Sequence, residues 1–218
     1  PYEHIVAALN LTPEPSTGPR QIVATYRYRD AAGVEVRQKI RYAPKDFRIR
    51  HRPGPGAEWV WKMPKLASYP LYRLPEIQAA IATGRTIYIV EGEKDADRLA
   101  AHSQPATTNF DGASKKVQKP KWRKEYTDQL TGAALVVLIP DKDESGRAHM
   151  LNIARQLQGK VAKLRYLEMP DFPDPDKKPV KPVKDVSNWF EQGGTLADFL
   201  LLVEQASAPP IDNNPPPN

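Results

Sequence analysis

The 218-residue sequence contains no cysteine. This absence excludes a disulfide framework, a cysteine-ligated zinc ribbon and a cysteine nucleophile within these residues. No stretch approaches the ~20 apolar residues that a membrane-spanning helix needs, and no N-terminal signal peptide or internal repeat is visible. We therefore expect neither a membrane protein nor a disulfide-stapled secreted domain, and the lack of cysteine fits a reducing, intracellular setting.

Proline and positive charge are both in excess. Proline accounts for 23 of 218 residues, about twice the usual ~5%, and the net charge at pH 7 is +6. Hydrophobic residues make up 40% of the chain, which is enough for a packed core and too much for a wholly disordered chain. The length predicts one or two domains of roughly 100–200 residues each. Because the sequence begins at Pro1 and not at Met, we expect a fragment or a processed product.

The net positive charge arises from the first part of the chain. Residues 1–84 contain thirteen Lys and Arg against seven Asp and Glu, so this part alone carries the whole net charge of +6. A basic part of this kind permits nucleic acid as a partner. We divide the sequence into a basic, strand-rich N-terminal subdomain (1–84), a charge-neutral domain (85–206) and a proline-rich linker or disordered tail (207–218).

Hydrophobic patterns predict two kinds of structure. In the basic part, alternation predicts a hairpin over 21–30 and 34–43, a short strand over 58–62 and a proline-started helix over 75–84. In the neutral part, strands alternate with helices, which is typical of a parallel sheet covered on both faces. The strands are expected at 86–91, 105–110, 134–140 and 161–169, the helices at 94–102, 144–159, 185–192 and 195–205, and a surface loop at 170–182.

Carboxylates follow two of these apolar strands. Glu91 ends the first, and Asp141 and Asp143 end the second. In open α/β sheets ligands bind outside the carboxyl ends of the strands, and carboxylates that converge there without a basic partner raise each other's pKa. A hard divalent cation such as Mg²⁺ or Mn²⁺ prefers oxygen ligands and would relieve this repulsion. The alternative is that strand ends simply carry polar turn formers; we favour a functional site because two such ends are followed by glycines.

The motifs that contain these acids resemble a known family. VEGEKDADRL (90–99) and LIPDKDESGR (138–147) are similar to the two signature motifs of the Toprim domain, which DnaG-type primases, topoisomerases, OLD-type nucleases and small ribonucleases share. The resemblance implies an α/β fold with a Toprim-like Rossmannoid parallel sheet flanked by helices, preceded here by a smaller basic α+β subdomain. It further implies that Glu91 acts near the nucleophile, as a base or a metal-linked group, with Asp141 and Asp143 as principal metal ligands.

Two more acids enter through the same resemblance. Asp95 matches the acid one helical turn after the first Glu, and KPVKDVSNWF (181–190) resembles a third acidic element of the primase-type members, which adds Asp185. The expected cofactor is Mg²⁺ or Mn²⁺, as two ions. Lys142 departs from the Asn or Arg that is common between the two aspartates of the second motif.

The basic part is similar to the region that precedes Toprim in primase-helicase proteins of phages and mobile elements. The implied function is a DNA primase catalytic core, a nucleotidyltransferase that synthesises primers on single-stranded DNA during replication of a phage, plasmid or mobile element. The implied partners are template, nucleoside triphosphates and a helicase domain or protein, in the cytoplasm of a bacterial or phage-infected cell and without a membrane. Because the chain lacks cysteine, the zinc module that primases usually carry is not within it.

Two alternatives to the primase stay open. A Toprim nuclease would use the same acids and metals with water as the nucleophile, and a non-catalytic nucleic-acid-binding module would keep the acids for metal or structure. A topoisomerase is excluded because the chain is too short to include DNA-gating domains and a nucleophilic tyrosine module.

Basic residues are expected to hold the polynucleotide and the triphosphate. The alternative for the arginines is a solvated edge strand. Trp59, Trp61 and Tyr72 are candidates for base stacking, although we favour core positions for the tryptophans. Glu93 and Asp97 are expected to be exposed acids at a helix start. The predicted binding residues are Lys45, Arg48, Arg50 and Arg52 from the run 45–52, with Lys94, Lys142 and Lys184.

Overall fold

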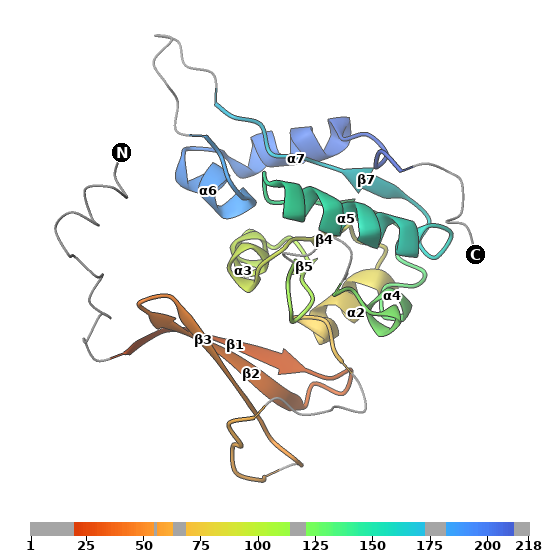
Figure 1. Cartoon of the computed structure of the whole chain (residues 1–218). Coiled ribbons are helices and arrows are strands. Elements are labelled where there is room, and N and C mark those ends of the chain that lie inside the picture. The colour runs from red at the N-terminus through yellow and green to blue at the C-terminus, as the bar shows by residue number, and fades with distance from the viewer. Residues whose placement is uncertain (1–19, 55, 63–68, 114–120, 173–181, 212–218) are drawn as a thin grey trace, which may run out of the picture.

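The computed structural model describes residues 20–54, 56–62, 69–113, 121–172 and 182–211. It contains two sheets (Figure 1): a three-stranded antiparallel sheet in the order β1-β2-β3 and a four-stranded sheet in the order β5-β4-β6-β7. All pairs in the four-stranded sheet are parallel. The predicted α/β class, with a parallel sheet flanked by helices and a separate N-terminal sheet, is confirmed.

The antiparallel sheet arises from alternating sequences joined by tight turns. It consists of β1 (Gln21–Arg29), β2 (Glu35–Ala43) and β3 (Asp46–His51). The Asp30 carboxylate accepts hydrogen bonds from the backbone N–H groups of Ala32 and Val34 and so closes the first turn. The predicted hairpin is thus confirmed. The predicted strand at 58–62 is wrong, because this segment forms only an isolated bridge between His51 and Val60.

The parallel sheet is short-stranded and buried on both faces. Ile87 and Ile89 face one core with residues of α2, α4 and α5, whereas Tyr88 and Val90 face a second core with residues of α3, α6 and α7. The strands are β4 (Ile87–Ile89), β5 (Ala106–Thr107), β6 (Val136–Leu138) and β7 (Leu164–Tyr166). The helices are α2 (Leu74–Ala82), α3 (Glu93–Ala101), α4 (Lys124–Asp128), α5 (Glu144–Leu157), α6 (Val186–Glu191) and α7 (Leu196–Gln205).

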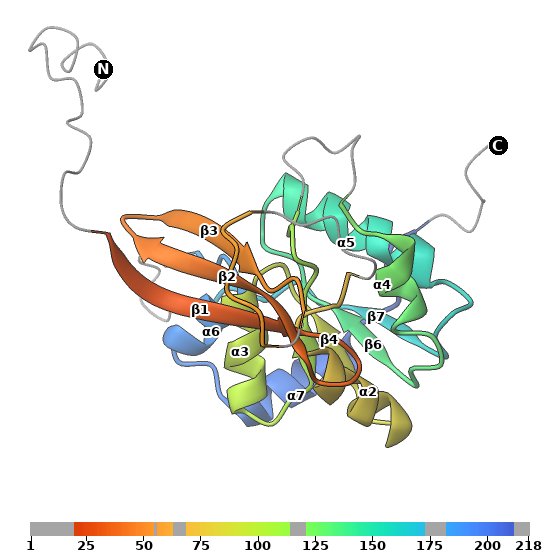
Figure 2. The same cartoon turned by 90° about the horizontal axis from the view of Figure 1, so that it is seen from below.

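The two sheets pack together through tyrosines of β1. Tyr28 is fully buried; its ring lies 5.1 Å from that of Tyr72 and 5.0 Å from that of Phe110. Its hydroxyl donates to Glu93 at 2.7 Å, at the start of α3. Figure 2 shows β1 and β2 running past α3 toward α2. The antiparallel sheet is therefore held against α3, the helix that contains most of the first acidic motif.

Residues near both predicted domain boundaries pack against the parallel sheet or its helices. α2 belongs to the predicted N-terminal subdomain, yet Ile77 packs in the same core as β4 and β6. After α7, Ser207 forms a bridge with Tyr166, and Pro209 is buried. The division of the chain at residues 84 and 206 stays a prediction. No helix in the described part of the chain is long and apolar enough to cross a membrane.

Candidate active site

Glu91 and Asp141 meet because β4 and β6 are neighbours in the parallel sheet. The two strands run in the same direction, so the residues that follow them emerge at one edge. The Glu91 carboxylate accepts a hydrogen bond of 3.0 Å from the backbone N–H of Asp141. The structure thus joins the two predicted motifs directly.

Gly146 allows the start of α5 to approach this pair closely. A Cβ atom at this position would lie 1.9 Å from Oε1 of Glu91 and 2.7 Å from the carbonyl oxygen of Asp141. Real Cβ atoms do not approach other atoms so closely, so no other residue fits without a shift of the backbone. The glycine in the second motif therefore has a steric role at the site.

Asp95 and Asp185 extend the cluster from α3 and α6. Asp95 is buried and accepts a hydrogen bond of 3.1 Å from the backbone N–H of Ser187. Asp185 caps the N-terminus of α6, where it accepts from the N–H of Asn188 at 2.6 Å. The negative charge of Asp185 raises the pKa of both Asp95 and Asp141. All four acids therefore share one electrostatic environment.

Burial and mutual repulsion make three of these acids weak. Burial, followed by the charges of Glu91, Asp95, Asp185 and Asp143, raises the pKa of Asp141 to about 8. Burial is also the main cause that raises the pKa of Glu91 to about 7 and that of Asp95 to about 6. Hydrogen bonds from the backbone oppose these shifts at Glu91 and Asp95 without cancelling them. Protons or cations are therefore favoured here at neutral pH.

Asp143 behaves differently from its neighbours. It caps the N-terminus of α5, and its carboxylate accepts from the N–H of Gly146 and the hydroxyl of Ser145, each at 2.8 Å. These hydrogen bonds lower its pKa, so Asp143 is ionised at neutral pH. The site thus combines one strongly acidic carboxyl with three weakly acidic ones.

The donor set suits a hard divalent cation. The acids of the cluster supply carboxylate oxygens, and their mutual repulsion is the electrostatic condition that a divalent ion relieves. Within the described residues, no group of three or more His, Asp or Glu side chains is already arranged around a common point as a metal site. The prediction of Mg²⁺ or Mn²⁺ at Glu91, Asp141 and Asp143, with Asp95 and Asp185, stays a prediction.

The lysines of the acidic motifs are near the acids in sequence, but two of them pair with other carboxylates. Lys94 forms an ion pair of 3.1 Å with Glu191, and Lys142 forms one of 2.8 Å with Asp171. Lys184 is exposed and has no ion pair among the described residues. The predicted role of these three lysines in binding nucleotide stays a prediction.

The basic run 45–52 forms the turn before β3 and the strand itself, at the edge of the antiparallel sheet. Lys45 is exposed in the turn, and Arg48 lies 3.8 Å from Asp46. Arg50 and Arg52 instead stack on the ring of Trp59. This run therefore belongs to the antiparallel sheet, whereas Glu91 and Asp141 follow strands of the parallel sheet.

The two tryptophans after β3 lie against these arginines. The guanidinium of Arg50 lies 4.7 Å from the ring of Trp59 and 5.3 Å from that of Trp61, and that of Arg52 lies 4.5 Å from Trp59. Trp61 is 54% exposed. The expected core position is therefore wrong for the tryptophans, because no layer of the described structure covers them.

Glu93 and Asp97 are not the exposed acids that the sequence suggested. Glu93 is 5% exposed and forms an ion pair of 2.5 Å with Lys39 of β2, besides its bond to Tyr28. Asp97 is half-buried and accepts hydrogen bonds from the Tyr72 hydroxyl at 3.0 and 3.1 Å. Their burial follows from the packing of the antiparallel sheet on α3, which local sequence does not reveal.

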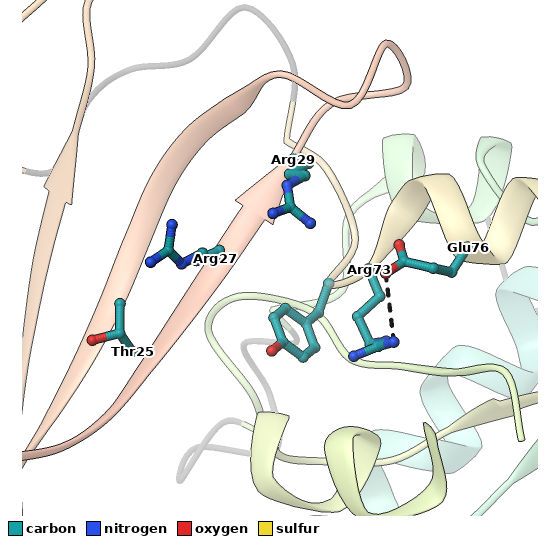
Figure 3. Close-up of a pocket in the computed structure, with 6 residues that line it drawn as sticks. Thr25, Arg27, Arg29, Arg73 and Glu76 are labelled. Atoms are coloured by element: carbon teal, nitrogen blue, oxygen red, sulfur yellow. Dashed lines mark ion pairs between the residues drawn. The ribbon is translucent and has the colours of Figure 1, made fainter. Parts of the chain in front are cut away.

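A cavity of about 140 Å³ lies between β1 and the start of α2 (Figure 3). Two of its arginines are balanced by acids: Arg73 lies 3.2 Å from Asp97 and 3.5 Å from Glu76, and Arg27 lies 3.3 Å from Glu35. Asp97 and Asp95 are two residues apart on α3 and so point to opposite sides of the helix. The cavity is therefore separate from the acidic cluster. Its lining consists of Thr25, Arg27, Arg29, Tyr72, Arg73 and Glu76.

Comparisons with known proteins bear on the fold. No protein-family model and no curated protein matches the sequence. Among solved structures, the primase fragment of the bacteriophage T7 primase-helicase protein matches at 23% identity with a TM-score of 0.52, over 82% of this chain and 61% of that chain. The Aquifex aeolicus primase, in its zinc-binding and RNA polymerase domains, matches at 15% identity with a TM-score of 0.58, over 95% of this chain and 50% of that chain. The chain has the fold of DnaG-type primase fragments.

A further match is a bacteriophage T7 structure in which the lagging-strand DNA polymerase interacts with primase domains bound to an RNA/DNA hybrid and dTTP. It shares 25% identity and a TM-score of 0.52, over 85% of this chain and 78% of that chain. The resemblance to a primase core that the motifs predict is confirmed as a likeness of fold. The chain spans about three fifths and one half of the length of the T7 and Aquifex fragments named first.

Proposed function

We propose that this chain is the catalytic core of a DNA primase that joins nucleotides on a single-stranded DNA template. The observation that supports this proposal most strongly is the convergence of Glu91, Asp95, Asp141 and Asp185 at one edge of the parallel sheet, in the fold of primase fragments. Burial and mutual repulsion raise the pKa of Glu91, Asp95 and Asp141, and such a cluster favours a cation, which suits phosphoryl transfer because this chemistry requires positive charge at the phosphate.

The side chains of the cluster would have different roles in this reaction. Asp143 is ionised at neutral pH, and with Glu91 and Asp141 it would hold a divalent ion, to which Asp95 and Asp185 would add a second or outer set of ligands. Bound there, Mg²⁺ or Mn²⁺ would neutralise charge on the phosphate and orient the attacking and leaving oxygens. Glu91, next to the nucleophile, would act either as the base that accepts the proton of a 3′-hydroxyl or as a metal-linked group.

The antiparallel sheet supplies a surface for the template. Arg50 and Arg52 lie on Trp59, and Trp61 leaves much of its ring exposed. Alternation of arginine with aromatic rings suits single-stranded nucleic acid, because phosphates pair with the cations and bases stack on the rings. We include Lys45 and Arg48, which lie at the same edge of the sheet, in this surface.

Primer synthesis tests the proposal. The protein is given a single-stranded DNA template, nucleoside triphosphates and Mg²⁺ or Mn²⁺, and labelled products are separated by size. We expect new oligonucleotides from the wild-type chain and none from the double variant Asp141→Asn, Asp143→Asn. Asn at 143 keeps the cap of α5, because Asn is as good an N-cap as Asp.

The variant Asp128→Asn is the matched control, because Asp128 is an exposed acid of α4 outside the cluster. It is expected to retain wild-type synthesis. Shortening of the template without new oligonucleotides would show that the chain is a nuclease. Binding of template without any reaction, with a steep dependence on salt, would show a non-catalytic module.

A further inference from the structure

Three polar side chains near the interface of the two sheets contain buried nitrogen or oxygen atoms that are not satisfied by hydrogen bonds. Among the described residues, the three nitrogens of the Arg37 guanidinium, Nε of Arg123 and the hydroxyl of Tyr126 form no hydrogen bond of normal geometry, although the Arg37 guanidinium lies close enough to the Tyr126 hydroxyl to affect its pKa. Arg37 is 0% exposed, although it carries a positive charge. An unsatisfied buried group costs roughly 1–3 kcal/mol, and more if it is charged. So many unpaired donors in one place indicate that a partner completes them.

The aromatic residues around these groups support the cations without using their N–H groups. The Arg37 guanidinium lies 3.7 Å from the centre of the Phe110 ring and 5.4 Å from that of Tyr69. Arg123 lies 4.0 Å from the same Tyr69 ring. Ring faces attract cations but do not replace hydrogen bonds at the edge of the guanidinium. The two arginines therefore share the Tyr69 ring, and these ring contacts occupy none of their N–H groups.

The charges in this cluster do not balance among the described residues. Asp111 is 3.9 Å from Arg123, and its charge also reaches Arg37 and Tyr126. Within the described part of the chain, Asp111 is the acid that the ion pairs and charge effects place at both arginines, so these two guanidinium groups share its carboxylate. A water molecule would satisfy donors but would leave the excess positive charge buried, whereas an anion provides both acceptors and the opposite charge.

The cluster lies beside the acidic cluster. Phe110 and Asp111 follow β5, whose carboxyl end is at the same edge of the parallel sheet as that of β4. The Thr108 hydroxyl donates to the carbonyl oxygen of Glu91 at 2.8 Å, and a Cβ on Gly112 would lie 3.5 Å from that oxygen. An anion held here would therefore lie next to the residues that are proposed to act on phosphate.

We propose that Arg37, Arg123 and Tyr126 together bind a phosphate group of a nucleotide or of a nucleic-acid strand. The identity of the ligand rests on the proposed function, since phosphate is the anion that the neighbouring acidic cluster would handle. Guanidinium donors match phosphate oxygens in pairs. Arg37 forms the buried end of the site, and Arg123, whose side chain is 41% exposed, connects it with solvent.

Binding to the metal-free chain tests this inference. Inorganic phosphate, a nucleoside triphosphate and a single-stranded DNA oligonucleotide are each titrated calorimetrically in the presence of a chelator, at constant ionic strength maintained with chloride. We expect the nucleoside triphosphate or the oligonucleotide to bind. Tyr126→Phe, which removes one hydroxyl and preserves the ring, is expected to weaken that binding roughly tenfold.

Arg37→Met separates a ligand-binding role from a structural one. If the guanidinium is unsatisfied until an anion binds, its replacement by an apolar side chain of similar length leaves the Tm of the ligand-free chain unchanged or raises it. The same variant then loses binding of the phosphate-containing ligand. If the guanidinium holds the sheets together by itself, the Tm falls. Arg155→Gln, at an exposed arginine of α5, is the matched control and should change neither binding nor Tm.

The two ligand sources and the two proposals are distinguished by the same measurements. Binding of the triphosphate alone identifies a nucleotide, and binding of the oligonucleotide alone identifies a strand. Three results would overturn the inference: binding of inorganic phosphate but of neither larger ligand, no binding by the wild-type chain, or binding by Tyr126→Phe and Arg37→Met that equals binding by the wild type. If the wild-type chain makes no primers but still binds the nucleoside triphosphate or the oligonucleotide, the proposed function is contradicted and the phosphate site remains.

Discussion

The acidic edge of the parallel sheet and the basic edge of the antiparallel sheet place charge in opposite ways. At the acidic edge, Glu91 and Asp141 are largely buried, and backbone hydrogen bonds and the contact with Gly146 fix their positions. At the basic edge, Arg50 and Arg52 lie near the surface and rest on aromatic rings. Chemistry needs groups whose geometry is fixed, whereas a strand of variable sequence needs a tolerant surface.

The largest effect in this comparison is expected from Gly146→Ala. The new methyl group would overlap Oε1 of Glu91 and the carbonyl oxygen of Asp141, and either α5 or the acidic pair must move. We expect primer synthesis to fall on the order of 100-fold, because displacements of about 1 Å at a reacting centre have effects of that size. The measurement is the initial rate of synthesis at saturating metal.

Gly54→Ala is the matched control for this variant. No atom lies within 4 Å of a Cβ built at Gly54, and its backbone is not left-handed. Wild-type synthesis by Gly54→Ala with a large loss in Gly146→Ala is expected. Equal activity of the two variants would show that the acidic edge is as tolerant as the basic one.

A smaller effect is expected at the basic edge, from Trp61→Ala. Loss of one stacked base costs about 1–3 kcal/mol, so the affinity for single-stranded DNA should fall roughly tenfold. Trp61→Phe retains a ring and should recover most of the affinity. The measurement is fluorescence anisotropy of a labelled oligonucleotide, with the salt dependence recorded for each variant; an unchanged affinity in Trp61→Ala would remove this edge from the template surface.

The smallest effect is expected on stability, from the weak acids. A carboxyl whose pKa is raised by folding stabilises the folded chain below its unfolded pKa near 4, and this stability is lost as the pH rises through its folded pKa. For Asp141 that loss extends to about pH 8. In the metal-free chain, Asp141→Asn should therefore raise the Tm at pH 8 relative to the wild type and have less effect at pH 5. A Tm that falls equally at both values would contradict the raised pKa.

The acidic edge could be predicted from the sequence because its position depends on local pattern. Apolar runs identify β4 and β6, and the polar residues that follow them must emerge at one edge of a parallel sheet. The close approach of α5 to Glu91 and Asp141 depends on Gly146, and this steric role is visible only in the three-dimensional structure. The sequence also identified the hairpin and all helices of the described chain except α4, a five-residue helix too short to show a periodic pattern.

The basic part was harder to predict because charged residues occupy both faces of its strands. The sequence does not show which face of β2 packs inward, so the burial of Arg37 and the pairing of Lys39 with Glu93 were missed. Aromatic residues usually indicate a core, and on this basis Trp59 and Trp61 were misplaced. The packing of one sheet on the other decides these positions, and no local pattern encodes it.

The central claim is that the acidic edge binds a divalent metal. Calorimetric titration of the chain with Mn²⁺ at pH 7, in buffers of different ionisation enthalpy, measures both affinity and proton release. We predict that Mn²⁺ binds, that protons are released because Glu91 and Asp141 have pKa values of about 7 and about 8, and that Asp141→Asn abolishes binding. Absence of Mn²⁺ binding to the wild-type chain, or equal binding by Asp141→Asn, would contradict the claim.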